Sequence, residues 1–160
     1  MGKNNLVIDR ANKSLSMHRV FNAPREIVWK VVTDPAQVPN WWGPRKTTTV
    51  VDKMDFRVGG VWRYLSKDLD GNNEVAFNGV YRETDEPNKL IYTFEFEPVP
   101  GHVSVDCLTF EELPGGKTKI TDVTTFDSVE ALEGMVGSGM EGGATETWDR
   151  LDELVQKVQE

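Results

Sequence analysis

The last long segment of the chain, residues 138–158, constrains the fold more than any other stretch. Its sequence, SGMEGGATETWDRLDELVQKV, repeats apolar side chains at steps of three and four residues, which is the spacing of one face of an α-helix. Ser138 and Glu141 match the S-x-x-E capping box, so we expect the helix to begin there. A helix of about twenty residues is roughly 30 Å long, which is enough to cover one face of a small sheet.

Two glycines, Gly142 and Gly143, interrupt the first turns of this helix. Each costs about 1 kcal/mol relative to alanine in a helix interior. Two interpretations are open from the sequence alone. The glycines let the helix approach the sheet closely, or they leave space over a cavity or allow that end of the helix to move.

Most of the chain before this helix is predicted to be strand, because alternating or β-branched segments are separated by turn sequences. The expected strands cover residues 14–21, 46–51, 55–67, 74–84, 89–97, 102–112 and 117–126. Gly59 and Gly60 are interpreted as a bulge or bend within the third of them. Short helices are expected after Pro24, up to about Asn40, and from a capping box at Asp127 and Glu130.

This order predicts an α+β fold in which a curved antiparallel sheet of six to seven strands carries two short helices and a long C-terminal helix. A length of 160 residues fits one domain. We expect residues 1–13 to be a loose N-terminal arm and residues 14–160 to form that single domain.

Composition and charge exclude several classes of protein. No apolar run approaches the 18 or so residues of a membrane span, and the amino terminus has no signal-peptide pattern. A single cysteine, Cys107, suits a reducing compartment, so a cytoplasmic location is expected. Residues 85–160 carry 5 Lys and Arg against 17 Asp and Glu, and such an acidic surface disfavours nucleic-acid binding. Residues 1–84 are more basic, with 13 against 9, and could form an interaction surface.

Four separated segments resemble one known family in the same order along the chain. They are RVFNAPREIVWKVVTDPAQVPNWWGP at 19–44, FRVGGVWRY at 56–64, FNGVYRETDEPNKLIYTFEF at 77–96 and SGMEGGATETWDRLDEL at 138–154. Together they are similar to the START-like SRPBCC superfamily, in particular to the branch named after the activator of the heat-shock-protein-90 ATPase. The resemblance implies a helix-grip fold, with a carboxy-terminal helix held over an apolar cavity.

The resemblance also implies a function. Members with this domain alone are mostly thought to bind small apolar or aromatic molecules, which is the partner expected here, and a few relatives are polyketide cyclases or aromatases. A chaperone-linked interaction module is a third hypothesis, although 160 residues leave no room for the additional chaperone-stimulating domain of the eukaryotic members. No cofactor is expected, and a homodimer is compatible with the sequence.

The candidate ligand-binding residues are aromatic and apolar side chains expected on the inner faces of the strands and of the helix. They come from the Trp41-Trp42 loop, from paired positions on three strands, and from the start of the last helix. These residues are Trp42, Trp62, Tyr64, Phe77, Tyr81, Phe94, Phe96, Leu108, Met140, Ala144 and Trp148. Their residue types do not distinguish a filled core from a lined cavity.

Two acids, Asp106 and Asp122, complete the candidate set. If the 113–117 turn pairs Glu112 with Thr118, both carboxyl groups lie on the strand face that carries Leu108 and Phe110. Acids among apolar neighbours have raised pKa values. They could orient a polar ligand or act as acid and base in a cyclase- or dehydratase-like reaction. The opposite face also carries apolar residues, so solvent exposure of the pair remains the alternative.

The remaining motifs predict no chemistry. His102 and Cys107 are five residues apart and face opposite ways on a regular strand, and no metal-ligand spacing occurs. The run Gly137–Gly142 satisfies G-x-G-x-x-G, but it follows a helix rather than a strand and therefore does not predict a dinucleotide site.

Overall fold

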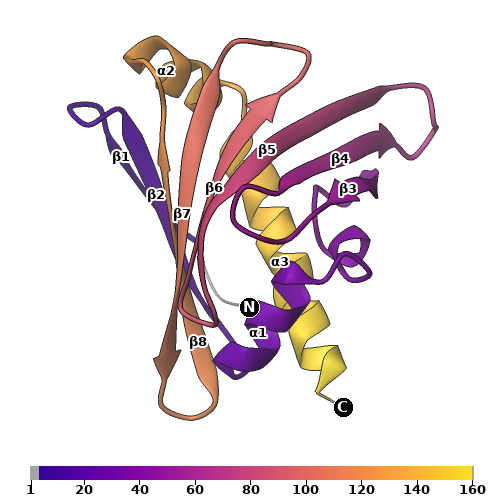
Figure 1. The fold of residues 1–160 in the computed structure, drawn as a ribbon, viewed down its shortest axis with the longest axis vertical. Coiled ribbons are helices and arrows are strands. Elements are labelled where there is room, and N and C mark those ends of the chain that lie inside the picture. The colour runs from indigo at the N-terminus through magenta and orange to yellow at the C-terminus, as the bar shows by residue number, and fades with distance from the viewer. Residues whose placement is uncertain (1–3, 160) are drawn as a thin grey trace.

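A computed structural model describes residues 4–159 and consists of one curved antiparallel sheet with helices on its inner face. The strands are hydrogen-bonded in the order β1-β2-β8-β7-β6-β5-β4-β3. Figure 1 shows α3 running along the sheet, with α1 towards the lower end and α2 at the upper end. The elements are β1 Asn5–Asp9, β2 Ser14–Phe21, α1 Arg25–Thr33, a short 3₁₀ helix η1 Val38–Asn40, β3 Thr47–Met54, β4 Val61–Asp68, β5 Glu74–Asp85, β6 Lys89–Phe96, β7 Val103–Leu113, β8 Lys117–Thr125, α2 Val129–Gly137 and α3 Met140–Val158.

The sheet has eight strands rather than the expected six to seven, because part of the N-terminal arm is a strand. Residues 5–9 form β1, which pairs antiparallel with β2 from Asn5 opposite His18 to Asp9 opposite Ser14. Leu6 and Ile8 turn inward and pack against buried residues. The prediction of a loose arm is therefore wrong for residues 5–9, and residues 1–3 of that arm lie outside the described part of the chain.

The Gly59-Gly60 pair lies before a strand and not within one. Strand β4 begins at Val61, and residues 55–60 form the connection from β3. A Cβ added at Gly60 would lie 1.9 Å from the backbone oxygen of Asp55, so the close backbone approach in this connection requires glycine. The bulge in this strand pair falls instead on β3, between Val51 and Lys53.

Both predicted capping boxes differ from the observed helix starts. Gly139, with a φ of 81°, occupies the N-cap of α3 without a side-chain hydrogen bond. The Ser138 hydroxyl donates instead to the Met135 carbonyl oxygen at the end of α2. Helix α2 is capped by Ser128, whose oxygen accepts a 3.0 Å hydrogen bond from the Ala131 amide, rather than by Asp127.

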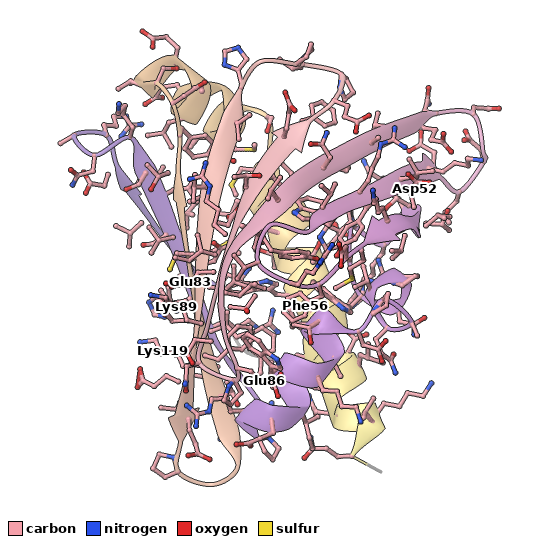
Figure 2. All side chains as sticks on the ribbon, in the orientation of Figure 1. Asp52, Phe56, Glu83, Glu86, Lys89 and Lys119 are labelled. Atoms are coloured by element: carbon pink, nitrogen blue, oxygen red, sulfur yellow. The ribbon has the colours of Figure 1, made fainter. Side chains whose placement is uncertain are left out.

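The core lies between the inner face of the sheet and the helices. Trp148, Leu151 and Val155 of α3 are buried against it, and the Trp148 ring meets the Phe21 ring edge-on with centroids 5.5 Å apart. Figure 2 shows Phe56, in the β3–β4 connection, beside α1, where its ring packs edge-on against Trp29 and Tyr81. A smaller apolar cluster of Leu15, Phe126 and Leu132 holds α2 to the upper end of the sheet.

Ionic and polar contacts hold the second half of α3. The Arg19 guanidinium, 1% exposed, donates to Asp149 at 2.7 Å and lies 3.7 Å from Asp152. Asp152 also accepts a 3.1 Å hydrogen bond from the Asn22 amide, and Arg150 donates to the Gly43 carbonyl oxygen at 2.7 Å. These contacts tether α3 to β2 and to the 41–44 loop.

Candidate functional site

A pocket of about 660 Å³ lies between α2 and the inner face of the sheet at the upper ends of β5, β6 and β7. This volume is within the usual range of small-molecule sites, which is about 300–1,000 Å³. The lining residues are mostly apolar. They are Phe77, Phe94, Phe96, Val99, His102, Val103, Ser104, Phe126, Asp127, Glu130, Ala131, Gly134, Met135 and Ser138.

One wall of this pocket is aromatic because three inner positions of two adjacent strands carry phenylalanine. Phe77 of β5 is opposite Phe96 of β6 in the sheet register. The Phe77 ring centroid lies 5.2 Å from that of Phe96 and 5.5 Å from that of Phe94. Such a wall offers planar apolar surface to an aromatic or aliphatic ligand.

The facing wall is formed by α2, whose pocket side carries small residues. Ala131 and Gly134 line the pocket one turn apart, with Met135 beside them. A Cβ added at Gly134 would meet no atom within 4 Å. Gly134 therefore leaves space on the pocket side of α2 that a side chain would fill.

Polar groups stand at the mouth and along one side of the pocket. The His102 Nδ1 atom lies 3.4 Å from Asp127 Oδ2, and both side chains are exposed. Glu130 is exposed in the first turn of α2. Ser104 is buried and donates its hydroxyl hydrogen to the Phe94 carbonyl oxygen at 3.3 Å. The pocket thus combines an apolar interior with a polar, acidic rim.

A second cavity, of about 50 Å³, lies deeper between the sheet, α1 and η1. Trp62, Tyr64, Tyr81 and Leu108 line it, together with Trp41 and Tyr92 among others. Burial raises the pKa of Tyr64 to about 12 and raises that of Tyr92 well above its usual value, so these phenols are neutral at physiological pH. This cavity has room for a few water molecules and not for an organic ligand.

The Asp106–Asp122 pair lies on the inner face, and the predicted register is confirmed. Glu112 pairs with Thr118, Leu108 with Asp122 and Asp106 with Thr124. Thr124 donates a 2.6 Å hydrogen bond to Asp106. Burial raises the pKa of both carboxyl groups, and the neighbouring Asp106 raises that of Asp122 further. Of the two carboxyl groups, Asp122 is therefore the one whose protonated form is favoured more strongly.

The structure divides the predicted site residues among three environments. Phe77, Phe94 and Phe96 line the large pocket, and Trp62, Tyr64, Tyr81 and Leu108 line the small cavity. The other six, which line neither, are Trp42, Asp106, Asp122, Met140, Ala144 and Trp148.

These six residues pack between and around the cavities. The Trp42 ring meets Tyr64 and Phe77 edge-on at centroid distances of 5.2 and 5.0 Å, so it stands between the two cavities. Met140 packs into the cluster under α2, and Ala144 and Trp148 pack into the main core. A ligand role for these residues remains a prediction.

The sequence prediction missed the α2 side of the pocket. Residues 131, 134 and 135 are spaced to share one helix face, and this spacing was a usable signal. It did not indicate where that face would lie relative to the sheet. His102 and Val99 were missed because they lie at or beside the turn that joins β6 to β7.

Between residues 4 and 159, no three His, Cys, Asp or Glu side chains are grouped as metal ligands would be. No helix within the same range is long and apolar enough to cross a membrane.

The fold defines the class of protein: a curved antiparallel sheet that grips a long carboxy-terminal helix. Comparison with known families identifies the family within this class. The family described as "Activator of Hsp90 ATPase homolog 1-like protein" matches residues 22–156. The chain belongs to this family.

Solved structures agree with this assignment over nearly the whole chain. A protein from Mycobacterium smegmatis, Ms6760, is 28% identical with a TM-score of 0.85, and the alignment covers 96% of each chain. A protein from Arthrobacter aurescens is 26% identical with a TM-score of 0.87, covering 96% of this chain and 91% of that one. An AHSA1-like protein from Aeromonas hydrophila shares the fold at 21% identity and a TM-score of 0.69, covering 91% and 94%. The comparison with curated proteins gave no match.

Proposed function

We propose that the protein binds a small apolar or aromatic molecule in the pocket between α2 and strands β5 to β7. The observation that carries this proposal is the pocket of about 660 Å³, with its wall of three phenylalanines facing the small residues of α2. Membership of a family with a helix-grip fold supports a ligand-binding domain.

The location differs from the one expected from the sequence, which was the space beneath the first half of α3. On the helical side of the pocket, the lining residues belong to α2 and end with Ser138, two residues before α3 begins. The proposed ligand therefore lies under α2, beside the start of α3.

Titration followed by two-dimensional amide NMR tests the proposal, with lipids, flavonoids and aromatic polyketides as the panel. We expect saturable shifts at Phe94, Phe96, Ala131 and Gly134, and none at the β7–β8 turn around Gly115. A panel that leaves the lining residues unshifted would contradict the proposal.

A variant that fills the pocket provides the matching loss of function. At Gly134 a larger side chain enters open space, so Gly134→Leu is expected to keep the fold and weaken binding at least tenfold, since it occupies the volume the ligand needs. Gly137→Leu is the control, because Gly137 ends the same helix, has the same open space and does not line the pocket. Equal affinity in the two variants would argue against this site.

The enzymatic alternative has one observation in its favour, which is that Asp106, buried, and Asp122, half-buried, lie on the same inner face of the sheet. Neither carboxyl group lines the large pocket, which favours binding over catalysis. A cyclase- or dehydratase-like activity would require turnover that Asp106→Asn abolishes while ligand affinity is retained.

A further inference from the structure

The charged groups around the large pocket are of one sign. Asp127 and Glu130 contribute carboxylates to its lining, and His102 contributes an imidazole that is charged only when protonated. The described lining residues include neither lysine nor arginine. A bound anion would thus meet two carboxylates and no permanent cation.

The carboxylates of Asp127 and Glu130 differ in whether a neighbouring basic group pairs with them. Asp127 faces His102 at 3.4 Å. Glu130 forms no ion pair with the described residues, although Glu133, three residues further along α2, pairs with Arg10. Glu130 lies in the first turn of α2, where a negative charge also favours the helix. The Glu130 carboxylate can therefore interact with a ligand group at the mouth of the pocket.

The buried cation Arg19 does not offset this charge, because it does not line the pocket. Arg19 is already paired with Asp149 and Asp152 on the α3 side of the sheet, and Ser104, the one buried polar residue of the lining, is neutral. Charges a few ångströms apart at a partly exposed site interact weakly but measurably, and salt screens them.

We infer that the pocket selects molecules with an apolar or aromatic body and an amine or other cationic nitrogen group at the mouth, and discriminates against carboxylates such as fatty acids. This inference rests on the proposed function and narrows its ligand class. Apolar contact with the phenylalanine wall supplies most of the affinity, and the sign of charge at Asp127 and Glu130 supplies the selectivity.

Three probes with one aromatic body and different polar ends test the inference: 2-(1-naphthyl)ethylamine, 2-(1-naphthyl)ethanol and 1-naphthylacetate. Affinities are measured by isothermal titration at pH 7 in low salt, with amide NMR to locate each probe. We expect the amine to bind about tenfold more tightly than the carboxylate, with the alcohol between them. Added salt should reduce this ratio, because the rim is exposed.

The double variant Asp127→Asn/Glu130→Gln should bring the affinities for the amine and the carboxylate to within about twofold of each other, with the larger changes at the two charged probes. Glu133→Gln is the matched control, since it removes a carboxylate of the same helix that does not line the pocket, and it should keep the preference. Equal binding of amine and carboxylate by the unmodified protein would overturn the inference, as would a preference that survives the double variant. Failure of all three probes, the neutral alcohol included, would overturn the proposed function itself and the inference with it.

Discussion

At the scale of single residues, the unusual feature is that charged groups are buried in the core. Arg19 and Asp152 are almost fully buried as a pair, and Asp106 and Asp122 lie on the inner face of β7 and β8, where burial raises the pKa of both. Burying a charge is costly unless it is paired or neutralised. A substitution at one of these positions therefore raises or lowers the free energy of unfolding according to which partner of the pair remains.

Asp122→Asn is expected to make the protein more stable at pH 8 than the unmodified chain, because the ionised form of Asp122 is disfavoured by burial and by the neighbouring Asp106. The folded protein raises the pKa of Asp122, so above about pH 4 the folded state binds more protons at this site than the unfolded state. The free energy of unfolding of the unmodified protein therefore falls as the pH rises from about 4 towards the raised pKa of Asp122. The asparagine side chain does not ionise, so the variant lacks this pH-dependent loss of stability. Its amide group can still donate a hydrogen bond to Asp106.

Urea unfolding at pH 4 and pH 8 measures the effect, with the gain expected at pH 8 and little gain at pH 4. Glu112→Gln, an exposed change on the neighbouring strand β7, is the control. A gain of equal size at both pH values would contradict a raised pKa at Asp122.

Arg19→Met is expected to lower the free energy of unfolding by about 3–5 kcal/mol, because it leaves the Asp152 carboxylate buried without its cation. Adding Asp152→Asn should recover part of this loss, since asparagine still accepts the Asn22 amide hydrogen and carries no charge. Urea unfolding of both single variants and of the double variant measures the coupling. Strictly additive losses would show that the two side chains are not coupled.

At the scale of elements, glycines have opposite roles in α3 and in the sheet. A Cβ added at Gly142 or Gly143 would meet nothing within 4 Å, whereas one at Gly79 would lie 1.8 Å from the Thr93 carbonyl oxygen. The glycines of α3 are thus not needed for close approach to the sheet. Neither glycine lines the large pocket or the small cavity, so the alternative of space over a cavity is not borne out at these positions, and movement of that end of the helix stays a prediction.

Gly142→Ala and Gly143→Ala are expected to stabilise the protein by about 0.5–1 kcal/mol each, because alanine fixes the helix backbone at a lower entropic cost. Gly79→Ala should instead cost several kcal/mol or prevent folding, since the backbone of β5 and β6 would have to separate. Thermal unfolding of the three variants compares them. Destabilisation by both α3 substitutions would mean that this end of the helix needs glycine.

At the scale of the whole molecule, the helical layer is held unevenly. The second half of α3 is tied by Arg19, Arg150 and three buried apolar residues. Helix α2, by contrast, buries only Leu132 among its described residues. The pocket lies under this weakly held part of the layer.

Hydrogen exchange should follow this difference. Amides of α2 and of residues 141–144 are expected to exchange faster than those of residues 150–156, because less buried surface must be exposed to open them. Ligand binding in the pocket should slow exchange in α2 specifically. Uniform protection along α2 and α3 would contradict the expectation that α2 opens separately.

The strands, their faces and much of the helix order could be predicted from sequence because these depend on local periodicity. The 113–117 turn alone determined the register that places Asp106 and Asp122 on the inner face. The same reasoning failed where a short segment depends on a distant partner. Residues 5–9 are a strand only because β2 offers them an open edge, and the aromatic candidates divide between a filled core and two cavities according to the packing around them.

The sequence by itself determined that a curved sheet carries a long C-terminal helix, since alternation along the strands and three- to four-residue spacing in the helix are properties of neighbouring residues. Only the tertiary structure decided where the protein leaves space. That space depends on how far α2 stands from Phe77, Phe94 and Phe96, and this separation is set by contacts among Leu15, Phe126 and Leu132. Leu15 is far from the other two in the chain, so no local pattern encodes how closely α2 packs against the sheet.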